Sequence, residues 1–291
     1  MGEVRVTVPA STANLGSGFD ALGMALAMHD TVAVRVADHG LRIEVTGVGA
    51  GSVPRDEGHL VLRALRAAAE RLGLALPGLV LSCQNTIPHA RGLGSSAAAI
   101  VAGVAAAYRL AGKVLDDDAL QLAASFEGHA DNAAACLLGG LVVAWQDGGF
   151  YRATRLSPHE SLRPIALVPE TESATHTTRG LLPSQVPHVD AAFAAGRAAL
   201  AVHALTRAPQ LLLPATADRL HQDYREAAWP ESMRLVRGLR SAGMAAAISG
   251  AGPTVLALST DGGLPDDLEL AGFAVCPLAV DRRGVRVEAA D

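Results

Sequence analysis

Pro88-His89-Ala90-Arg91-Gly92-Leu93-Gly94-Ser95-Ser96-Ala97-Ala98 is a glycine- and serine-rich run that leads into an apolar helix, predicted for Ser95–Leu110. The first N–H groups of a helix have no intrahelical partners, and the helix dipole favours an anion beside them. Glycine at positions 92 and 94 lets the backbone approach a phosphate closely. The serine hydroxyls and the charge of Arg91 add further groups for an anion, so the run predicts a phosphate-binding loop.

Other interpretations of this loop compete with phosphate binding. A serine N-cap preceded by glycine would explain the same residues. The run also fits the dinucleotide pattern G-x-G-x-x-A, but the seven residues Asn85–Arg91 separate it from the preceding strand, where that pattern needs a tight turn. A Walker A loop needs a lysine beside the serine, which this sequence lacks, and the G-x-S-x-G elbow of serine hydrolases does not occur.

The composition limits the classes of protein. The 291 residues can bury a core as one large or two medium domains, and half of them are apolar, which excludes a disordered chain. The net charge is −5, so no surplus of positive charge points to a nucleic-acid partner, and we expect none. Lys113 is the one lysine, so an anion site would depend on arginine, backbone N–H groups or a metal. The longest apolar run, residues 97–108, is shorter than the ~20 residues of a membrane span. With no targeting segment visible, we expect a cytoplasmic protein, with no membrane contact and with free cysteine thiols.

Hydrophobic periodicity predicts strands and helices in alternation. Strands are expected at Val4–Val8, Thr31–Val36, Leu41–Thr46, Leu79–Cys83, Leu141–Trp145, Ile165–Val168, Ala245–Ile248, Val255–Leu258 and Phe273–Val280. Further helices are expected at Leu60–Leu72, Ala119–Phe126, Ala191–Leu205 and Glu231–Ala242. We interpret Asp116–Asp118 as the cap and first turn of a helix, with a metal site as the alternative. The proline and polar residues of Ser157–Pro164 predict a boundary between two domains, residues 1–157 and 158–291.

Two further glycine-containing stretches lie near the ends of the chain. They read Pro9-Ala10-Ser11-Thr12-Ala13-Asn14-Leu15-Gly16-Ser17-Gly18-Phe19-Asp20 and Ser249-Gly250-Ala251-Gly252-Pro253-Thr254. Together with the central loop, and in this order, they resemble the three motifs of the GHMP kinases. The resemblance spans nearly the whole chain and implies an α+β, two-domain GHMP kinase fold. Its N-terminal, ATP-binding domain would be like domain 2 of ribosomal protein S5 and its C-terminal domain ferredoxin-like, with the active site between them.

Within that class, the chain is most similar to the homoserine kinases. The similarity is carried by the N-terminal motif, by the stretch from Thr175 to Arg179, and by Glu127-Gly128-His129-Ala130-Asp131-Asn132 and His221-Gln222-Asp223-Tyr224-Arg225. It implies transfer of the γ-phosphate of ATP to the hydroxyl of L-homoserine, on the route to threonine, in an enzyme that is often a homodimer. Two alternatives stay open: a GHMP kinase with a mevalonate-type or sugar acceptor, and a nucleotide-binding sensor without turnover.

The resemblance also implies roles for single residues. Ser96 and Glu127 would hold Mg²⁺, a cation that usually binds one or two carboxylates together with phosphate oxygens. Homoserine is a zwitterion, so its site needs groups of both charges. The substrate-binding candidates are Arg179 and Arg225 for its carboxylate, Asp20 and Asp131 for its ammonium, and Asn14, His129, Asn132, Gly250 and Gly252 around them.

Asn132 occupies the position where other GHMP kinases are described as having an aspartate base. Because phosphoryl transfer has a loose transition state, positioning and charge neutralisation supply most of the catalysis. We therefore assign Asn132 to orientation of the hydroxyl, with Asp131 and Arg179 as the other catalytic candidates. A second departure is His59, which stands where the family often has asparagine and which we expect to hydrogen-bond the base or ribose of ATP.

Overall fold

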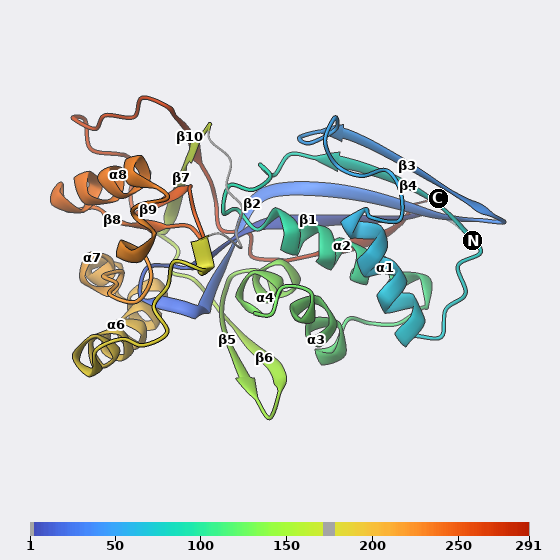
Figure 1. The fold of residues 1–291 in the computed structure, drawn as a ribbon, viewed down its shortest axis with the longest axis horizontal. Coiled ribbons are helices and arrows are strands. Elements are labelled where there is room, and N and C mark those ends of the chain that lie inside the picture. Colours follow the sequence, from blue (N-terminus) through green and yellow to red (C-terminus); the bar gives the residue numbers. More distant parts are fainter. Residues whose placement is uncertain (1–2, 171–177, 291) are drawn as a thin grey trace.

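Two β-sheets, each with helices packed against it, lie side by side in the molecule (Figure 1). The structure is a computed structural model and describes residues 3–170 and 178–290. Thr175, at the start of one stretch that carries the family resemblance, lies outside the described residues, whereas Arg179 at its end lies within them.

The first sheet contains the long hairpin that reaches across the molecule. Its strands are β1 (Glu3–Asn14), β2 (Gly18–Ala37), β3 (Gly40–Gly47), β4 (Gly78–Asn85), β5 (Leu141–Asp147), β6 (Phe150–Leu156) and β11 (Arg286–Ala290). Their order is β11-β1-β2-β4-β3, and the β5–β6 hairpin pairs with the first half of β2. β3 and β4 run parallel and the other pairs antiparallel, because helix α1 connects β3 to β4 as a crossover.

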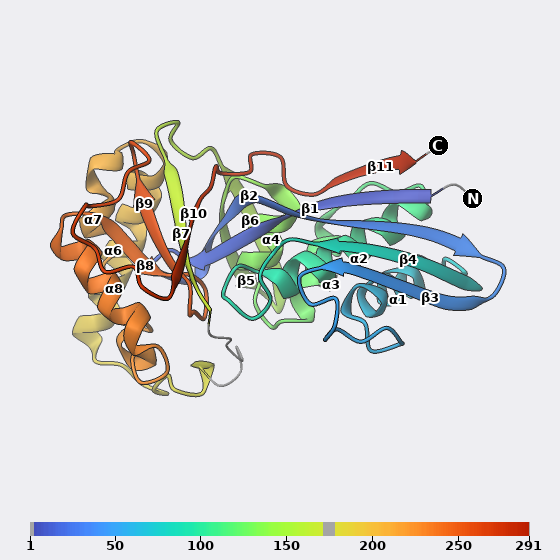
Figure 2. The same ribbon diagram turned by 90° about the horizontal axis from the view of Figure 1, so that it is seen from above.

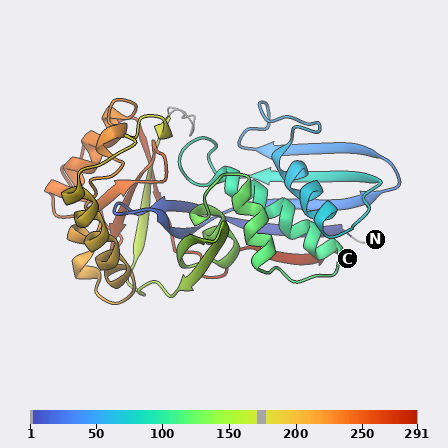
Figure 3. The ribbon, with the colours of Figure 1, turned by 60° about the horizontal axis from the view of Figure 1, so that its bottom comes forward.

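Four helices pack on one side of this sheet, where Figure 3 shows them in front of the strands. They are α1 (Leu60–Arg71), α2 (Ser95–Leu110), α3 (Asp117–Ser125) and α4 (Asp131–Leu138). Helix α2 is buried over most of its length, as its apolar sequence predicts. Gly103 lets α1 approach α2 closely, since a Cβ atom there would overlap the carbonyl oxygen of Val61. This packing fixes the position of the N-terminus of α2.

The second sheet has the strand order β10-β7-β9-β8 with antiparallel pairing throughout. The strands are β7 (Arg163–Pro169), β8 (Ala245–Ile248), β9 (Val255–Ser259) and β10 (Phe273–Pro277). Helices α6 (His188–Thr206), α7 (Leu212–Ala215) and α8 (Pro230–Ser241) lie on the face turned away from the first sheet, with 3₁₀ turns at Pro209–Leu211 and Asp223–Arg225. This strand order confirms the ferredoxin-like prediction, although residues 260–272 join β9 to β10 without a helix.

The two sheets are joined by the tip of the β1–β2 hairpin. Figures 1 and 3 show this dark-blue tip inside the orange part of the molecule. The Ser17 hydroxyl donates to the carbonyl of Ala215 at 2.8 Å, and the Gly250 N–H donates to the carbonyl of Ala13 at 3.1 Å. The N-terminal and C-terminal glycine motifs therefore meet in space.

The chain returns to the first sheet at its end. β11 pairs with β1, as Figure 2 shows beside the two termini, although it belongs to residues 158–291, the predicted C-terminal domain. We keep the division at residue 157 as a proposal, with the return of β11 added to it. Within the described residues, no helix combines the length and the apolar character that a membrane crossing needs.

Candidate active site

Three adjoining cavities lie around the glycine-rich loop and the tip of the β1–β2 hairpin. We call them the α1 cavity, beside the start of α1, the loop cavity, against the glycine-rich loop, and the hairpin cavity, at the tip of the β1–β2 hairpin. Ser95 and Ser96 line both the α1 cavity and the loop cavity. The loop and hairpin cavities share His129, Asn132, Gly250 and Ala251. Because they share these wall residues, the three cavities lie side by side and together form one candidate site.

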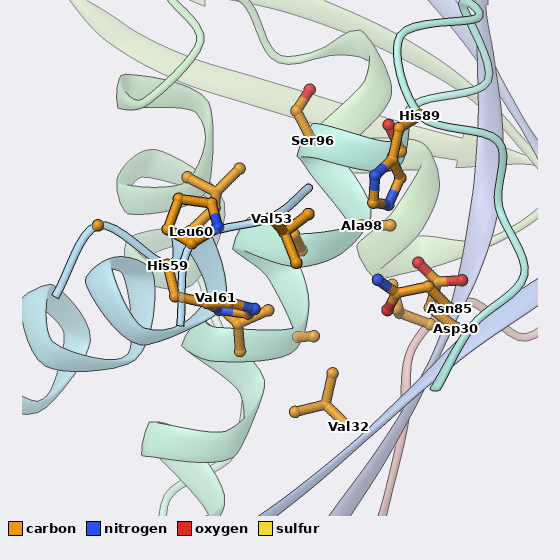
Figure 4. A pocket seen from close by; sticks show the side chains of 16 residues that line it. Asp30, Val32, Val53, His59, Leu60, Val61, Asn85, His89, Ser96 and Ala98 are labelled. Atoms are coloured by element: carbon orange, nitrogen blue, oxygen red, sulfur yellow. The ribbon is translucent and has the colours of Figure 1, made fainter. Parts of the chain in front are cut away.

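The α1 cavity has a volume of about 230 Å³ and a mostly apolar wall. Figure 4 shows His59 on one side of it, at the start of α1, and Asp30, Asn85 and His89 on the other. His59 is only 6% exposed, and its Nδ1 atom has no hydrogen-bond partner in the described part of the chain. Burial lowers the pKa of His59, which keeps the ring neutral. The α1 cavity is therefore a mostly apolar space, and the histidine in its wall has one ring nitrogen without a hydrogen-bond partner among the described residues.

The loop cavity, also of about 230 Å³, is formed around the N-terminus of α2. Gly94 is the N-cap residue, with φ of 69°, and Gly92 has φ of 75°. A Cβ atom on Gly94 would overlap the hydroxyl of Ser11, and one on Gly92 would overlap the carbonyl oxygen of Ser249. The backbone path and the close packing both require glycine at these two positions. This geometry leaves the first N–H groups of α2 facing the cavity.

Most of the residues predicted to bind ATP line these two cavities. They are His59, His89, Ala90, Gly92, Gly94, Ser95, Ser96 and Ala98. Leu93 and Ala97 are instead buried in the core, and Pro88 lines neither cavity. Burial gives the side chains of Leu93 and Ala97 a packing role, and the ATP contacts expected of these three residues stay predictions.

Arg91 does not place its charge in the loop cavity, contrary to the prediction. Its Nε atom donates to the carbonyl of Pro169 at 2.9 Å, its Nη2 atom to that of Glu170 at 2.5 Å, and its Nη1 atom to that of His89 at 3.2 Å. Pro169 ends β7, so the guanidinium ties the loop to the second sheet. The groups that the loop leaves available to an anion are therefore backbone N–H groups and serine hydroxyls.

Ser96 and Glu127, the predicted metal ligands, are in direct contact. The Ser96 hydroxyl donates to Oε1 of Glu127, while Oε2 is buried and has no partner among the described residues. Burial raises the pKa of Glu127, although the Ser96 hydrogen bond and the charge of His129 act in the opposite direction. An unpartnered buried carboxylate oxygen beside a hydroxyl is a donor set that suits Mg²⁺, and a bound cation would favour the ionised form.

The hairpin cavity is small, about 50 Å³, and is lined by charges of both signs. Arg179 forms an ion pair with Asp20, and the guanidinium groups of Arg179 and Arg225 each lie 5.8 Å from the ring centroid of Phe19. Asp131, 1% exposed, supplies the second carboxylate. The predicted cationic and anionic residues are thus brought together around a space suited to a small zwitterion.

A hydrogen-bonded chain lies where the loop and hairpin cavities adjoin. His129 Nδ1 lies 2.8 Å from Oδ1 of Asp131, which also accepts the backbone N–H of Asn132 at 2.7 Å. The hydroxyl of Ser11 donates to Oδ1 of Asn132 at 2.9 Å. Burial acts to lower the pKa of His129, but the hydrogen bond to Asp131 and the charges of Asp131 and Glu127 outweigh it, so the pKa is raised. Ser11 was not predicted as a site residue, although it lies in the quoted N-terminal motif.

The remaining candidates differ in what their polar groups contact. Asn14 lines the hairpin cavity, but its amide accepts from the Asp20 N–H at 3.0 Å and donates to the Gly250 carbonyl at 2.9 Å. Gly250 lines both cavities. Gly252, predicted to bind substrate, lines neither, because it packs against the ring of Trp229.

Comparison with known proteins agrees with the family resemblance. The family model for the GHMP kinases N terminal domain matches residues 59–140, and that for the GHMP kinases C terminal matches residues 191–276. A homoserine kinase of Streptomyces avermitilis is 55% identical over 290 residues, which cover 98% of this chain and 95% of that protein. A homoserine kinase of Rhodococcus erythropolis is 51% identical over 93% of this chain and 90% of that protein. The crystal structure of homoserine kinase from Cytophaga hutchinsonii superposes with a TM-score of 0.86 at 29% identity, covering 99% of this chain and 98% of that one.

Proposed function

This chain belongs to the homoserine kinases of the GHMP kinase family, and we propose that its three cavities hold the reactants while the enzyme transfers the γ-phosphoryl group of ATP to the hydroxyl of L-homoserine. The products would be ADP and O-phospho-L-homoserine, an intermediate of threonine biosynthesis. In this proposal the α1 cavity takes the nucleoside, the loop cavity the phosphates and the hairpin cavity the amino acid.

The adjacency of the cavities is the observation that carries this proposal. His129, Asn132 and Gly250 lie on the walls of both the loop cavity and the hairpin cavity. A phosphate held at the N-terminus of α2 and a hydroxyl held at the hairpin tip would therefore lie next to each other. Phosphoryl transfer depends mainly on such positioning, so the arrangement supplies what the reaction needs.

Ser96 and Glu127 are the residues that would hold Mg²⁺ in the loop cavity. When bound, the cation neutralises charge that develops on the phosphate oxygens. The buried Oε2 of Glu127 gives this assignment its support, since a carboxylate oxygen without a partner costs free energy unless a cation or donor reaches it.

The charges of the hairpin cavity favour an amino acid over a sugar or an isoprenoid acceptor. Arg179 and Arg225 offer guanidinium groups to a carboxylate, and Asp20 and Asp131 offer carboxylates to an ammonium group. A neutral sugar would leave the buried guanidinium of Arg225 without a carboxylate, since its hydrogen-bond partners among the described residues are the ring of His221 and a backbone carbonyl. We assign the recognition of both ends of homoserine to these four residues.

Asn132 is assigned to orient the acceptor hydroxyl. Its Oδ1 atom accepts from Ser11, and its Nδ2 atom lies 3.4 Å from Oδ1 of Asp131, so one N–H of the amide is left as a donor for the hydroxyl. Oδ1 of Asp131 accepts from both His129 and Asn132, so this oxygen is engaged before substrate arrives. Both contacts support a mechanism in which the hydroxyl proton leaves late and no dedicated base is needed.

A coupled assay of ADP release with L-homoserine, mevalonate and galactose as acceptors tests the proposal. We expect turnover with ATP and Mg²⁺ that depends on homoserine. Faster turnover with mevalonate or galactose would replace the substrate assignment. Binding of ATP without any acceptor-dependent ADP release would indicate the nucleotide-binding sensor. The homodimer and the cytoplasmic location stay predictions.

A further inference from the structure

Arg225 is a buried cation whose guanidinium is held along one edge only. It is 2% exposed, and within the described residues no carboxylate forms an ion pair with it. Its Nη1 atom donates to Nδ1 of His221 at 3.0 Å and to the carbonyl of Gly250 at 3.1 Å. Its Nε atom has no partner in the described part of the chain. Since Nη1 is saturated, the edge formed by Nε and Nη2 is the one left to bind a carboxylate bidentately.

The contacts of His221 decide which of its ring nitrogens carries the proton. The ring is completely buried, and Nε2 lies 2.8 Å from the carbonyl oxygen of Gly16. A carbonyl only accepts, so Nε2 must be the donor. Nδ1 of the neutral ring then carries a lone pair, which is what the N–H of Arg225 requires. Protonation of Nδ1 would instead bring two donors face to face.

The surroundings of His221 favour the neutral ring. Burial lowers its pKa, as does the charge of Arg225, while the charge of Asp218 and the hydrogen bond to Gly16 act in the opposite direction. The Asp218 carboxylate, 3.6 Å from Nε2, also accepts the backbone N–H groups of His221 and Gln222, at 3.1 and 2.8 Å. The ring stacks on Phe19 with centroids 5.2 Å apart. The imidazole therefore has one position and one tautomer.

We propose that His221 is a positioning residue, which turns the Nε–Nη2 edge of Arg225 toward the carboxylate of the acceptor. The hairpin tip of the first sheet fixes the histidine tautomer through Gly16, and the histidine in turn fixes the arginine of the second domain. The inference rests on the proposed function, because it assigns the acceptor carboxylate to Arg225. It makes His221 a determinant of affinity for the amino acid rather than of the chemical step.

A matched pair of variants separates this role from a merely structural one. In His221→Asn, the side-chain amide reaches the position of Nδ1 and can accept from Arg225. In His221→Gln, the amide reaches the position of Nε2 and keeps the bond to Gly16 but leaves Arg225 without its acceptor. Both variants lose the stacking on Phe19. We expect the KM for L-homoserine to be about tenfold higher in His221→Gln than in His221→Asn, the factor for one charge-assisted hydrogen bond, with similar kcat and similar KM for ATP.

Equal KM values for homoserine in the two variants would overturn the inference about His221. The proposed kinase activity would still stand, because the wild-type control tests it separately. A wild-type enzyme without homoserine-dependent ADP release would instead refute the proposed function and the inference with it. A second measurement needs no variant, in case either one fails to fold. Long-range ¹⁵N–¹H spectra of the wild-type imidazole should show Nε2 protonated and Nδ1 unprotonated, and a proton on Nδ1 would overturn the proposal.

Discussion

Glu127 is the residue whose local chemistry most clearly calls for a ligand. Its carboxylate is held by Ser96 on one oxygen and has a second, buried oxygen without a partner in the described residues. Hydrogen bonding to Ser96 fixes the orientation of the carboxylate. Burial raises the pKa of Glu127 and so disfavours the ionised form unless a cation binds to it. A helix-end glutamate in solvent would have neither property. The structure thus favours a functional role over an ordinary surface position.

Glu127→Gln tests this role with little change of shape. The amide oxygen can still accept from Ser96, but the negative charge is gone, so Mg²⁺ binding and transition-state stabilisation should both suffer. We expect kcat to fall by about 10²–10³-fold, the usual effect of losing one preorganised electrostatic group. Steady-state assays over a range of Mg²⁺ concentrations measure this, and the saturating Mg²⁺ concentration should rise. Wild-type turnover and Mg²⁺ dependence in the variant would refute the metal assignment.

The His129–Asp131 pair predicts a pH dependence of stability. The raised pKa of His129 means that the folded protein holds the imidazolium at pH values where the unfolded chain has released the proton. The stabilisation is therefore fully present below the ordinary histidine pKa of about 6.5 and is lost as the pH rises through the folded-state pKa.

Asp131→Asn should remove most of this dependence, because the charge and the hydrogen bond that raise the pKa of His129 are both weakened. Urea unfolding over a series of pH values that begins below the ordinary histidine pKa of about 6.5 and extends to alkaline pH compares the variant with the wild type. The variant should lose more stability at the lower pH values. Equal losses across the series would show that His129 is not protonated by this pair. If Asp131→Asn also abolishes turnover with unchanged homoserine affinity, Asp131 is a base after all.

At the scale of elements, helix α2 has a functional N-terminus and an ordinary C-terminus, and both have glycine with positive φ. Gly94 has φ of 69° and Gly112 has φ of 68°. Gly94 is packed against Ser11, whereas nothing lies within 4 Å of the place where a Cβ on Gly112 would stand. The two ends therefore allow backbone strain to be separated from the function of the loop.

Gly112→Ala should cost about 1–2 kcal/mol of stability, the strain of a left-handed alanine, and leave the KM for ATP unchanged. Gly94→Ala carries the same strain and also drives a methyl group into Ser11 and the loop cavity, so it should abolish ATP binding. Thermal unfolding with and without ATP measures both effects in one experiment. Similar ATP-dependent stabilisation of the two variants would refute the assignment of the loop to the phosphates.

Local sequence patterns predicted the elements that depend on local interactions. The predicted helix Ser95–Leu110 and the strand Ala245–Ile248 coincide with α2 and β8. Helix α4 was not predicted, because it has eight residues and begins with Asp131 and Asn132, which are weak helix formers. β11 was not predicted either, since its pairing with β1 joins opposite ends of the chain and has no local signal.

The same distinction applies to the site. Residue types and motif order predicted the glycine loop, the contact of Ser96 with Glu127 and the mixed charges of the hairpin cavity. They did not predict where Arg91 points or that Asn14 binds backbone, because both depend on which groups the second domain brings nearby. A charged residue in a motif can serve the architecture of a site without touching its ligand.

At the scale of the whole molecule, the site exists only while the two sheets keep their relative position. The loop cavity takes its walls from α2, from the residues around α4 and from the loop after β8. The hairpin tip and Arg91 both connect the two sheets through hydrogen bonds that involve the backbone. Ser17 in the tip donates to a carbonyl of the second domain, Ala13 accepts a backbone N–H from it, and Arg91 donates to the carbonyl of Pro169. Backbone contacts of this kind fix geometry without occupying the cavities.

Arg91→Gln tests whether this arginine acts on the architecture or on ATP. Its guanidinium donates to carbonyls of Pro169, Glu170 and His89, so the variant should lose about 1–3 kcal/mol of stability in urea unfolding. Arg207→Gln, at an exposed arginine outside the cavities, removes the same charge and should cost little. The KM for ATP of Arg91→Gln should rise only to the extent that the loop becomes mobile, and its dependence on salt should match that of the wild type. A large, salt-dependent increase in KM with unchanged stability would instead mean that Arg91 leaves its carbonyl partners and binds the phosphates when ATP is present.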